Sequence, residues 1–330
     1  MVAISVGPIL MKRNALAGRW PATEMMLSGA LLFLPAASLA AQFPVENPRT
    51  VCTSRYEKDK AKVGQFVFRT YEVKASGKAC LQVFHDDKVI FRRTNDNDGW
   101  FRLGQRADKG DGVPAIPNGT DITGRGYPDM IVSTYSGGAH CCLSHFVFEL
   151  ESKFRLLATL QAEDSWPAYF AANDEGNHYY YFARDWTFSY WPGSFAGSPN
   201  HSVVLEYRSD DRGGGFHLAV DKMKRPVPTP REWQSGLDAV QNELALEQKG
   251  YANSLPNVLW QEVMDLIYTG HSDLAWKFLD EVGPQAQQGN YPDLADFCSR
   301  LKTSPYWADL ELTLRDVPPA CTNAEPDKSK

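Results

Sequence analysis

An oxygen-rich segment, Asp121-Ile-Thr-Gly-Arg-Gly-Tyr-Pro-Asp129, has the spacing of a cation-binding loop. Ca²⁺ takes oxygen ligands from alternate positions of a loop, with a glycine at the sharp turn and a carboxylate at the end. Asp121 and Asp129 supply carboxylates, Thr123 supplies a hydroxyl and Gly126 permits the turn. Ca²⁺ is therefore the candidate cofactor, with Asp121, Thr123 and Asp129 as its ligands.

This loop resembles the FG-GAP/VCBS-type repeat of integrin-like β-propellers, in which Asp-x-Asp/Asn-x-Asp-Gly-x-x-Asp precedes an apolar strand. Asp121, Gly126 and Asp129 match that pattern, and the resemblance implies a propeller-like sheet and bound Ca²⁺. Arg125 stands where the family places a carboxylate. The alternative is a metal-free loop in which the Arg125 guanidinium pairs with Asp121 or Asp129.

A second segment, Tyr135-Ser-Gly-Gly-Ala-His-Cys-Cys142, follows the apolar strand after this loop. Adjacent cysteines can form a vicinal disulfide, whose ring needs unusual backbone angles that neighbouring glycines permit. Such a ring would expose a rigid apolar surface for ligand contact. The candidates for that contact are Ser136, Gly137, Gly138, His140, Cys141 and Cys142.

The same segment has two other chemical interpretations. His140, His145 and the two cysteines are residue types that bind Zn²⁺ or copper, although neighbouring strand residues face opposite ways. A Cys–His pair could also act as a nucleophile and base. No orienting Asp or Asn can be assigned from the sequence, so no catalytic residue is named.

The Tyr-Ser-Gly-Gly-Ala-His-Cys-Cys sequence is also similar to a signature of exported bacterial proteins that carry no assigned activity. The similarity continues into 185–191 and 259–268. It implies a shared architecture across most of the chain and no particular reaction.

The first 40 residues have the parts of a secretory signal peptide. Lys12, Arg13 and Arg19 form a basic region, Met25–Ala37 is apolar, and Ser38-Leu-Ala40 provides small residues for cleavage. The apolar stretch is too short to span a bilayer. We therefore expect an exported protein, periplasmic or extracellular, that is not an integral membrane protein. Met1 and Met11 both fit as the start.

All six cysteines follow this leader, which predicts disulfides in an oxidising compartment. We expect local closure, pairing Cys52 with Cys80 and Cys298 with Cys321. Cys141 and Cys142 then remain to pair with each other or to stay reduced.

The mature chain divides into a part with the sequence pattern of strands and a part with the pattern of helices. Residues 44–225 are rich in short aromatic and β-branched runs separated by Gly and Asp turns, which predicts a mainly β domain, either propeller-like or a sandwich. Its length suffices for at most about four propeller blades. A Pro-rich linker at 226–230 precedes a small helical domain at 231–315 and a polar tail at 316–330. Gly270, Ala275 and Phe278 resemble the turn of a tetratricopeptide hairpin; the alternative is a compact helical cap.

Charge and motifs limit the function classes. The net charge is −6, and the leader carries three basic residues and one acidic, so the remainder is near −8 and a poor nucleic-acid binder. We expect an exported binding or interaction protein without assignable catalysis, with its surface near 121–142 and a protein or carbohydrate partner. The alternatives are a hydrolase acting on carbohydrate, with Asp185 as a candidate carboxylate, and a helical scaffold for another envelope protein. The aromatics of 179–195 could stack on sugars or fill the core.

Overall fold

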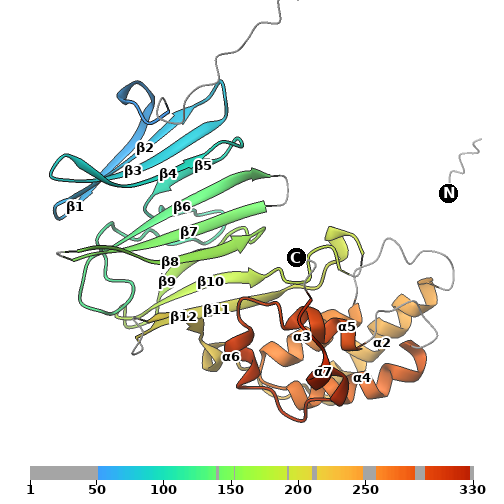
Figure 1. Ribbon diagram of the computed structural model, residues 1–330. Coiled ribbons are helices and arrows are strands. Elements are labelled where there is room, and N and C mark those ends of the chain that lie inside the picture. The colour runs from blue at the N-terminus through green and yellow to red at the C-terminus, as the bar shows by residue number, and fades with distance from the viewer. Residues whose placement is uncertain are drawn as a thin grey trace, which may run out of the picture. The chain divides into compact units, whose positions relative to one another are not determined.

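The computed structural model describes residues 51–138, 141–151, 153–191, 193–209, 214–247, 258–286 and 294–327. They all lie in one compact unit, Glu46–Lys330. Three antiparallel sheets come first along the chain and helices follow (Figure 1). The prediction of a mainly β part followed by a helical part is confirmed, and the described strands form no closed barrel or propeller ring. The predicted leader lies outside the described residues.

Each sheet is a four-stranded meander whose strands pair in chain order. The strands of the three sheets are β1 (Glu57–Val63), β2 (Phe66–Val73), β3 (Lys78–His85) and β4 (Lys88–Asn95); β5 (Trp100–Leu103), β6 (Asp129–Gly138), β7 (Cys141–Leu150) and β8 (Phe154–Glu163); β9 (Tyr169–Ala172), β10 (Tyr179–Asp185), β11 (His201–Arg208) and β12 (Gly215–Leu218). Short 3₁₀ turns lie at Ser54–Tyr56 and Phe195–Gly197.

The middle sheet is buried on both faces at the start of β6, where residues 130–132 are apolar at successive positions. On β6, Met130 and Val132 pack into a core shared with the first sheet. Ile131, which points to the opposite face, joins a larger core shared with the third sheet. The middle sheet therefore fixes where both of its neighbours sit.

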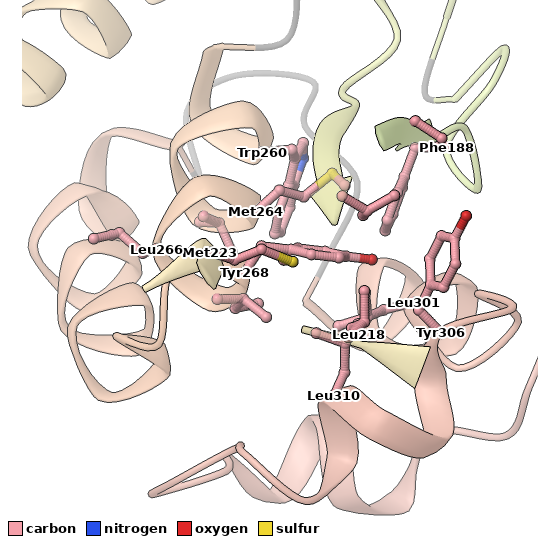
Figure 2. Packing of buried hydrophobic residues seen from close by; sticks show 14 of the residues in the cluster. Phe188, Leu218, Met223, Trp260, Met264, Leu266, Tyr268, Leu301, Tyr306 and Leu310 are labelled. Atoms are coloured by element: carbon pink, nitrogen blue, oxygen red, sulfur yellow. The ribbon is translucent and has the colours of Figure 1, made fainter. Parts of the chain in front are cut away.

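The helices cover the third sheet and share its core. They are α1 (Val220–Met223), α2 (Pro230–Glu247), α3 (Val258–Tyr268), α4 (Ser272–Ala286), α5 (Leu294–Leu301), α6 (Trp307–Glu311) and α7 (Pro319–Asn323). Figure 2 shows Met264 and Tyr268 of α3 pointing into the same core as Leu218 of β12. The chain on either side of the 226–230 segment is thus joined by one hydrophobic core.

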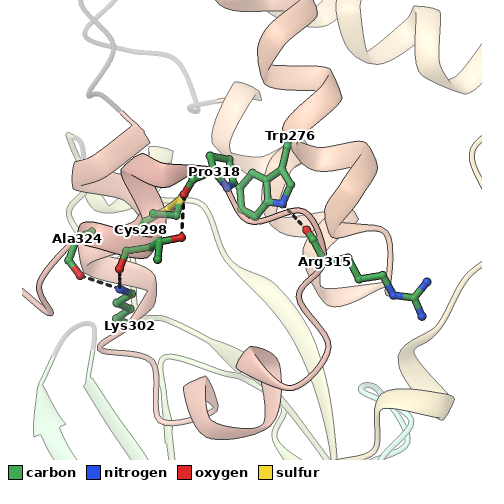
Figure 3. Close-up of a disulfide and its surroundings, with 8 residues drawn as sticks. Trp276, Cys298, Lys302, Arg315, Pro318 and Ala324 are labelled. Atoms are coloured by element: carbon green, nitrogen blue, oxygen red, sulfur yellow. Dashed lines mark hydrogen bonds between the residues drawn. A yellow bond between two sulfur atoms is a disulfide. The ribbon is translucent and has the colours of Figure 1, made fainter.

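Both local disulfides are confirmed. Cys52 bonds to Cys80, and Cys298 of α5 bonds to Cys321 of α7 (Figure 3). Close to the second disulfide, Lys302 Nζ donates to the carbonyl of Ala324 at 2.7 Å. The expected polar tail therefore contains a helix and folds back onto α5.

Three strands carry only a weak signal in the sequence. β1 is charged along its length and largely exposed, while β5 and β9 have four residues each. A charged edge strand and very short strands lack the apolar alternation that marks a strand in sequence. Among the described residues, no helix has the length and apolar character needed to cross a membrane.

Candidate ligand-binding site

The two segments singled out in the sequence lie at opposite ends of one strand. The 121–128 loop leads into β6, and Ser136 to Gly138 end it. With ten residues at about 3.3 Å each, β6 separates the two ends by about 30 Å. The two segments are therefore two separate places on the β6–β7 hairpin (Figure 1), and the expected binding surface near 121–142 stays a prediction.

The Asp121 carboxylate is hydrogen-bonded by the loop that it begins. Its Oδ2 accepts from the backbone N–H of Gly126 at 2.7 Å, and its Oδ1 accepts from the N–H of Arg125 at 3.1 Å. The Thr123 hydroxyl lies 3.3 Å from the same Oδ1. Asp121 therefore stabilises the turn through hydrogen bonds to backbone groups of its own loop.

Asp129 closes the other end of the loop and is 2% exposed. Its Oδ2 accepts from the N–H groups of Ile122 and Thr123 and from the Thr123 hydroxyl at 3.0 Å, while Oδ1 has no hydrogen-bond partner among the described residues. Burial raises the Asp129 pKa to about 7, and the Thr123 hydrogen bonds only partly oppose that rise. Asp121, Thr123 and Asp129 do converge, as the sequence predicts.

Arg125 does not hold this loop in the way expected from the sequence. Its guanidinium Nε donates at 2.7 Å to Glu149, a 2% exposed residue on β7, and its Nη1 lies 3.3 Å from the Tyr207 hydroxyl. The expected side-chain pairing with Asp121 or Asp129 is therefore wrong. No three His, Cys, Asp or Glu side chains of the described ranges are grouped to hold a metal ion.

The hairpin end of β6 is shaped by close backbone packing. Gly137 has φ +91°, and a Cβ there would lie 1.5 Å from the carbonyl oxygen of Asn97. The Ser136 hydroxyl accepts from the N–H of Cys142 at 2.7 Å. His140 and the side chain of Cys141 lie outside the described residues, so the vicinal disulfide and the metal and thiol interpretations there stay predictions.

A cavity of about 200 Å³ opens against the face of the middle sheet that looks toward the third sheet. Its floor is a row of three residues in register on neighbouring strands: Arg102 of β5 lies opposite Ser133 of β6, and Ser133 lies opposite His145 of β7. Its walls are the 104–113 loop and the 166–168 segment before β9.

Two tryptophans frame the cavity. Trp166 is 62% exposed although it is a large aromatic residue. Trp100 stacks on Tyr135, with 5.9 Å between ring centroids, and the Arg102 guanidinium lies 4.2 Å from the centroid of its ring. An exposed aromatic face beside a polar floor is the kind of surface that binds ligands with both apolar and hydroxylated parts.

His145 forms the buried end of the floor and is 4% exposed. Burial lowers its pKa to about 4, and its Nδ1 lies 2.8 Å from the hydroxyl of Tyr181, whose own pKa burial raises well above 10. Both side chains are therefore neutral at pH 7. This buried pairing of Nδ1 with Tyr181 does not match the role of metal ligand that the sequence suggests for His145.

Some of the charged groups that line the cavity already have polar partners within the described part of the protein, and one arginine does not. Arg106 forms an ion pair with Asp59 at 2.5 Å, and Asp108 accepts from the N–H of Gly110 at 3.0 Å within its own turn. Among the described residues, Arg102 has no carboxylate partner, only the Trp100 ring. Its guanidinium remains available for an anionic group.

Two further cavities lie among the helices. The larger, about 460 Å³, lies between the 225–229 segment and helices α2 to α4, but several of its polar groups are already paired: Asp265 with His201 at 2.6 Å, and His271 with the Arg225 carbonyl at 2.8 Å. A cavity of about 210 Å³ beside the Cys298–Cys321 disulfide is mostly apolar. Neither touches the β6–β7 hairpin.

Asp185, a candidate site carboxylate in the sequence, is structural. It is 1% exposed and accepts hydrogen bonds from the hydroxyls of Tyr268 and Ser304 and from the N–H of Thr187. The neighbouring aromatics Tyr181, Phe188 and Trp191 are buried in the shared core, so for these three residues the core interpretation is confirmed.

Sequence reasoning did not single out Trp100, Arg102 or Trp166. Trp100 and Arg102 are neighbours on β5, but Trp166 lies far along the chain from them, and only the fold of the 166–168 segment brings it to the same cavity. A tryptophan followed by proline at 166–167 in a polar stretch was the one available signal. Comparisons with protein families, with curated proteins and with solved structures gave no match.

Proposed function

We propose that this protein is an exported, non-enzymatic binding protein that takes a carbohydrate in the cavity between β5–β7 and the 166–168 segment. The observation that carries the proposal is the exposed Trp166 at the mouth of a cavity whose floor presents hydrogen-bonding side chains. The apolar face of a sugar packs on an aromatic ring, and its hydroxyls bind to planar and hydroxyl side chains below. Two of the three floor residues, Ser133 and His145, belong to the hairpin that carries the sequence signature.

The compartment and the fold relationship belong to the same proposal. The Cys52–Cys80 and Cys298–Cys321 disulfides support export. The three meanders have the strand number and order of propeller blades, and the 121–129 loop precedes β6 as in FG-GAP/VCBS-type repeats. We infer that the chain is related to that class.

The binding test is a screen of immobilised oligosaccharides, followed by titration of the tryptophan fluorescence with each glycan that binds. Trp166→Ala should weaken binding at least about fivefold, because the stacking surface is lost. Leu312→Ala is the control, since Leu312 is 86% exposed and lies on another part of the chain. Absence of glycan binding, or equal affinity of Trp166→Ala and wild type, would overturn the proposal.

A second candidate is glycoside hydrolysis, favoured by one observation: Asp108 and Asp111 both line the cavity, and such enzymes use two carboxylates. Release of reducing sugar from a bound glycan, abolished in both Asp108→Asn and Asp111→Asn, would establish it. Binding without product would leave the non-enzymatic proposal standing.

A further inference from the structure

The floor of the cavity is a line of groups that can all donate hydrogen bonds. Arg102, Ser133 and His145 face the cavity from three adjacent strands in direct register. Neighbouring strands are about 4.8 Å apart, so the line is about 10 Å long. That length matches a single sugar residue together with its exocyclic group.

The charge along this line is one-sided. Arg102 is the positive end and has no carboxylate partner among the described residues. The other arginine of the lining, Arg106, is already paired with Asp59 at 2.5 Å. The two lining carboxylates, Asp108 and Asp111, belong to the exposed 104–113 loop rather than to the floor.

We propose that the cavity selects an acidic sugar, one whose carboxylate binds the Arg102 guanidinium while Ser133 and His145 donate to neighbouring oxygens of the same residue. This inference rests on the proposed carbohydrate-binding function and names the class of glycan. A guanidinium matches a carboxylate with two parallel hydrogen bonds, which a neutral hydroxymethyl group or an ester cannot reproduce.

His145 contributes a fixed donor in this arrangement. The Tyr181 hydroxyl lies 2.8 Å from Nδ1. In the tautomer that this proposal assigns, the hydroxyl donates to Nδ1 and the imidazole hydrogen is on Nε2. A buried neutral ring that is held in one tautomer donates to a ligand oxygen without adding a second charge. The floor of the cavity therefore has one cation, Arg102, matched to one carboxylate of the ligand.

The test compares trigalacturonate with its methyl ester, which has the same sugar rings and no charge. Full-length protein is titrated with each by calorimetry at low and high salt. We expect the acid to bind at least about tenfold more tightly than the ester, and this preference should shrink as salt is added.

Single-residue variants test whether Arg102 causes the preference for the acid over the ester. Arg102→Gln should remove the preference for the acid, Arg102→Lys should retain part of it, and His145→Gln should weaken both ligands alike. Arg93→Gln is the matched control, because Arg93 also lies on a strand, 6.0 Å from the centroid of the Phe91 ring, but in the first sheet. Thermal unfolding of each variant checks that it is folded.

The outcomes separate the two proposals. Equal binding of acid and ester, or binding only of neutral glycans in the oligosaccharide screen, overturns the acidic-sugar inference and leaves carbohydrate binding intact. An acid preference that survives in Arg102→Gln also overturns it. Failure of every glycan in the screen overturns both.

Discussion

The Asp185 carboxylate accepts a hydrogen bond of 2.6 Å from the hydroxyl of Ser304, a residue 119 positions later in the chain. The same oxygen accepts from the Tyr268 hydroxyl. One buried acid at the end of β10 therefore connects the third sheet to α3 and to the segment that joins α5 and α6.

Replacement of this acid should destabilise the whole described unit. Asp185→Ala would leave the hydroxyls of Tyr268 and Ser304 without their acceptor in a buried site, and we expect a loss of about 2–4 kcal/mol in the free energy of unfolding. Urea denaturation followed by circular dichroism measures it. Asp174→Ala, in the exposed turn before β10, is the control; a loss equal to that of the control would contradict the structural role.

Asp129 should make stability fall as pH rises. Its folded pKa of about 7 lies above the unfolded value of 3.8, so the folded state holds its proton more tightly. Ionisation of the buried Asp129 therefore lowers the free energy of unfolding. This loss is absent below pH 3.8, grows between pH 3.8 and about 7, and reaches roughly 4 kcal/mol at most above pH 7.

Asp129→Asn removes this titration while keeping an oxygen acceptor for Ile122 and Thr123. The stability of the variant minus that of wild type should rise between pH 4 and 7. His145, whose lowered pKa has the opposite effect between about 4 and 6.5, is present in both proteins and cancels in the difference. A difference that does not change with pH would show that Asp129 ionises normally.

The Arg125–Glu149 pair should stabilise the loop without metal. Arg125→Ala leaves the buried Glu149 with Arg155, at 2.8 Å, as its only cationic partner in the described part of the chain, and should cost about 1–3 kcal/mol. Arg155→Ala should cost less, because Arg155 is 44% exposed. We expect millimolar CaCl₂ to leave the melting temperatures of wild type and Arg125→Ala unchanged; a rise in wild type would restore the calcium interpretation of Asp121, Thr123 and Asp129.

Gly137 should tolerate no side chain. A Cβ at this position meets the Asn97 carbonyl at 1.5 Å, and the backbone has φ +91°. We expect Gly137→Ala to cost about 2–4 kcal/mol, through both strain and displacement of Asn97. Gly64→Ala is matched in backbone type, with φ +55° and no atom within 4 Å, and should cost about 1 kcal/mol. Similar losses in thermal unfolding would exclude the close contact.

The Cys298–Cys321 disulfide should stabilise the protein by about 3 kcal/mol, as expected for a closed loop with a sequence separation of 23. The double variant Cys298→Ser/Cys321→Ser tests this by urea denaturation under non-reducing conditions. Peptide mapping of wild type without reduction should recover Cys298 linked to Cys321 and Cys52 linked to Cys80. Recovery of either pair with different partners would contradict the structure.

Much of the architecture follows from the sequence because apolar periodicity is local. Apolar residues at helical spacing in 257–268 predict a helix, and α3 spans Val258–Tyr268. Aromatic and β-branched residues in 65–73 predict a strand, and β2 spans Phe66–Val73. β1 is not predicted from the sequence, because its Lys and Asp side chains keep the edge of the first sheet in solvent and leave no apolar alternation.

The site could be predicted only in part, because it depends on register between strands. Nothing in the spacing of Arg102, Ser133 and His145 indicates that they are neighbours; the pairing of β5 with β6 and of β6 with β7 places them in a row. The signature segments, in contrast, are visible as motifs, but the sequence does not show that the full length of β6 keeps them apart.

The core shared by the third sheet and the helices also sets an order of events during synthesis. Leu205 of β11 and Leu218 of β12 belong to the same hydrophobic core as Leu301 and Cys321. A chain that emerges from its N-terminus first can pair its strands early but cannot cover this face until nearly its last residues have appeared. The apolar face of the third sheet therefore stays partly exposed until the C-terminal helices have been synthesised. Any factor that shields nascent apolar surface would act longest on β10 to β12.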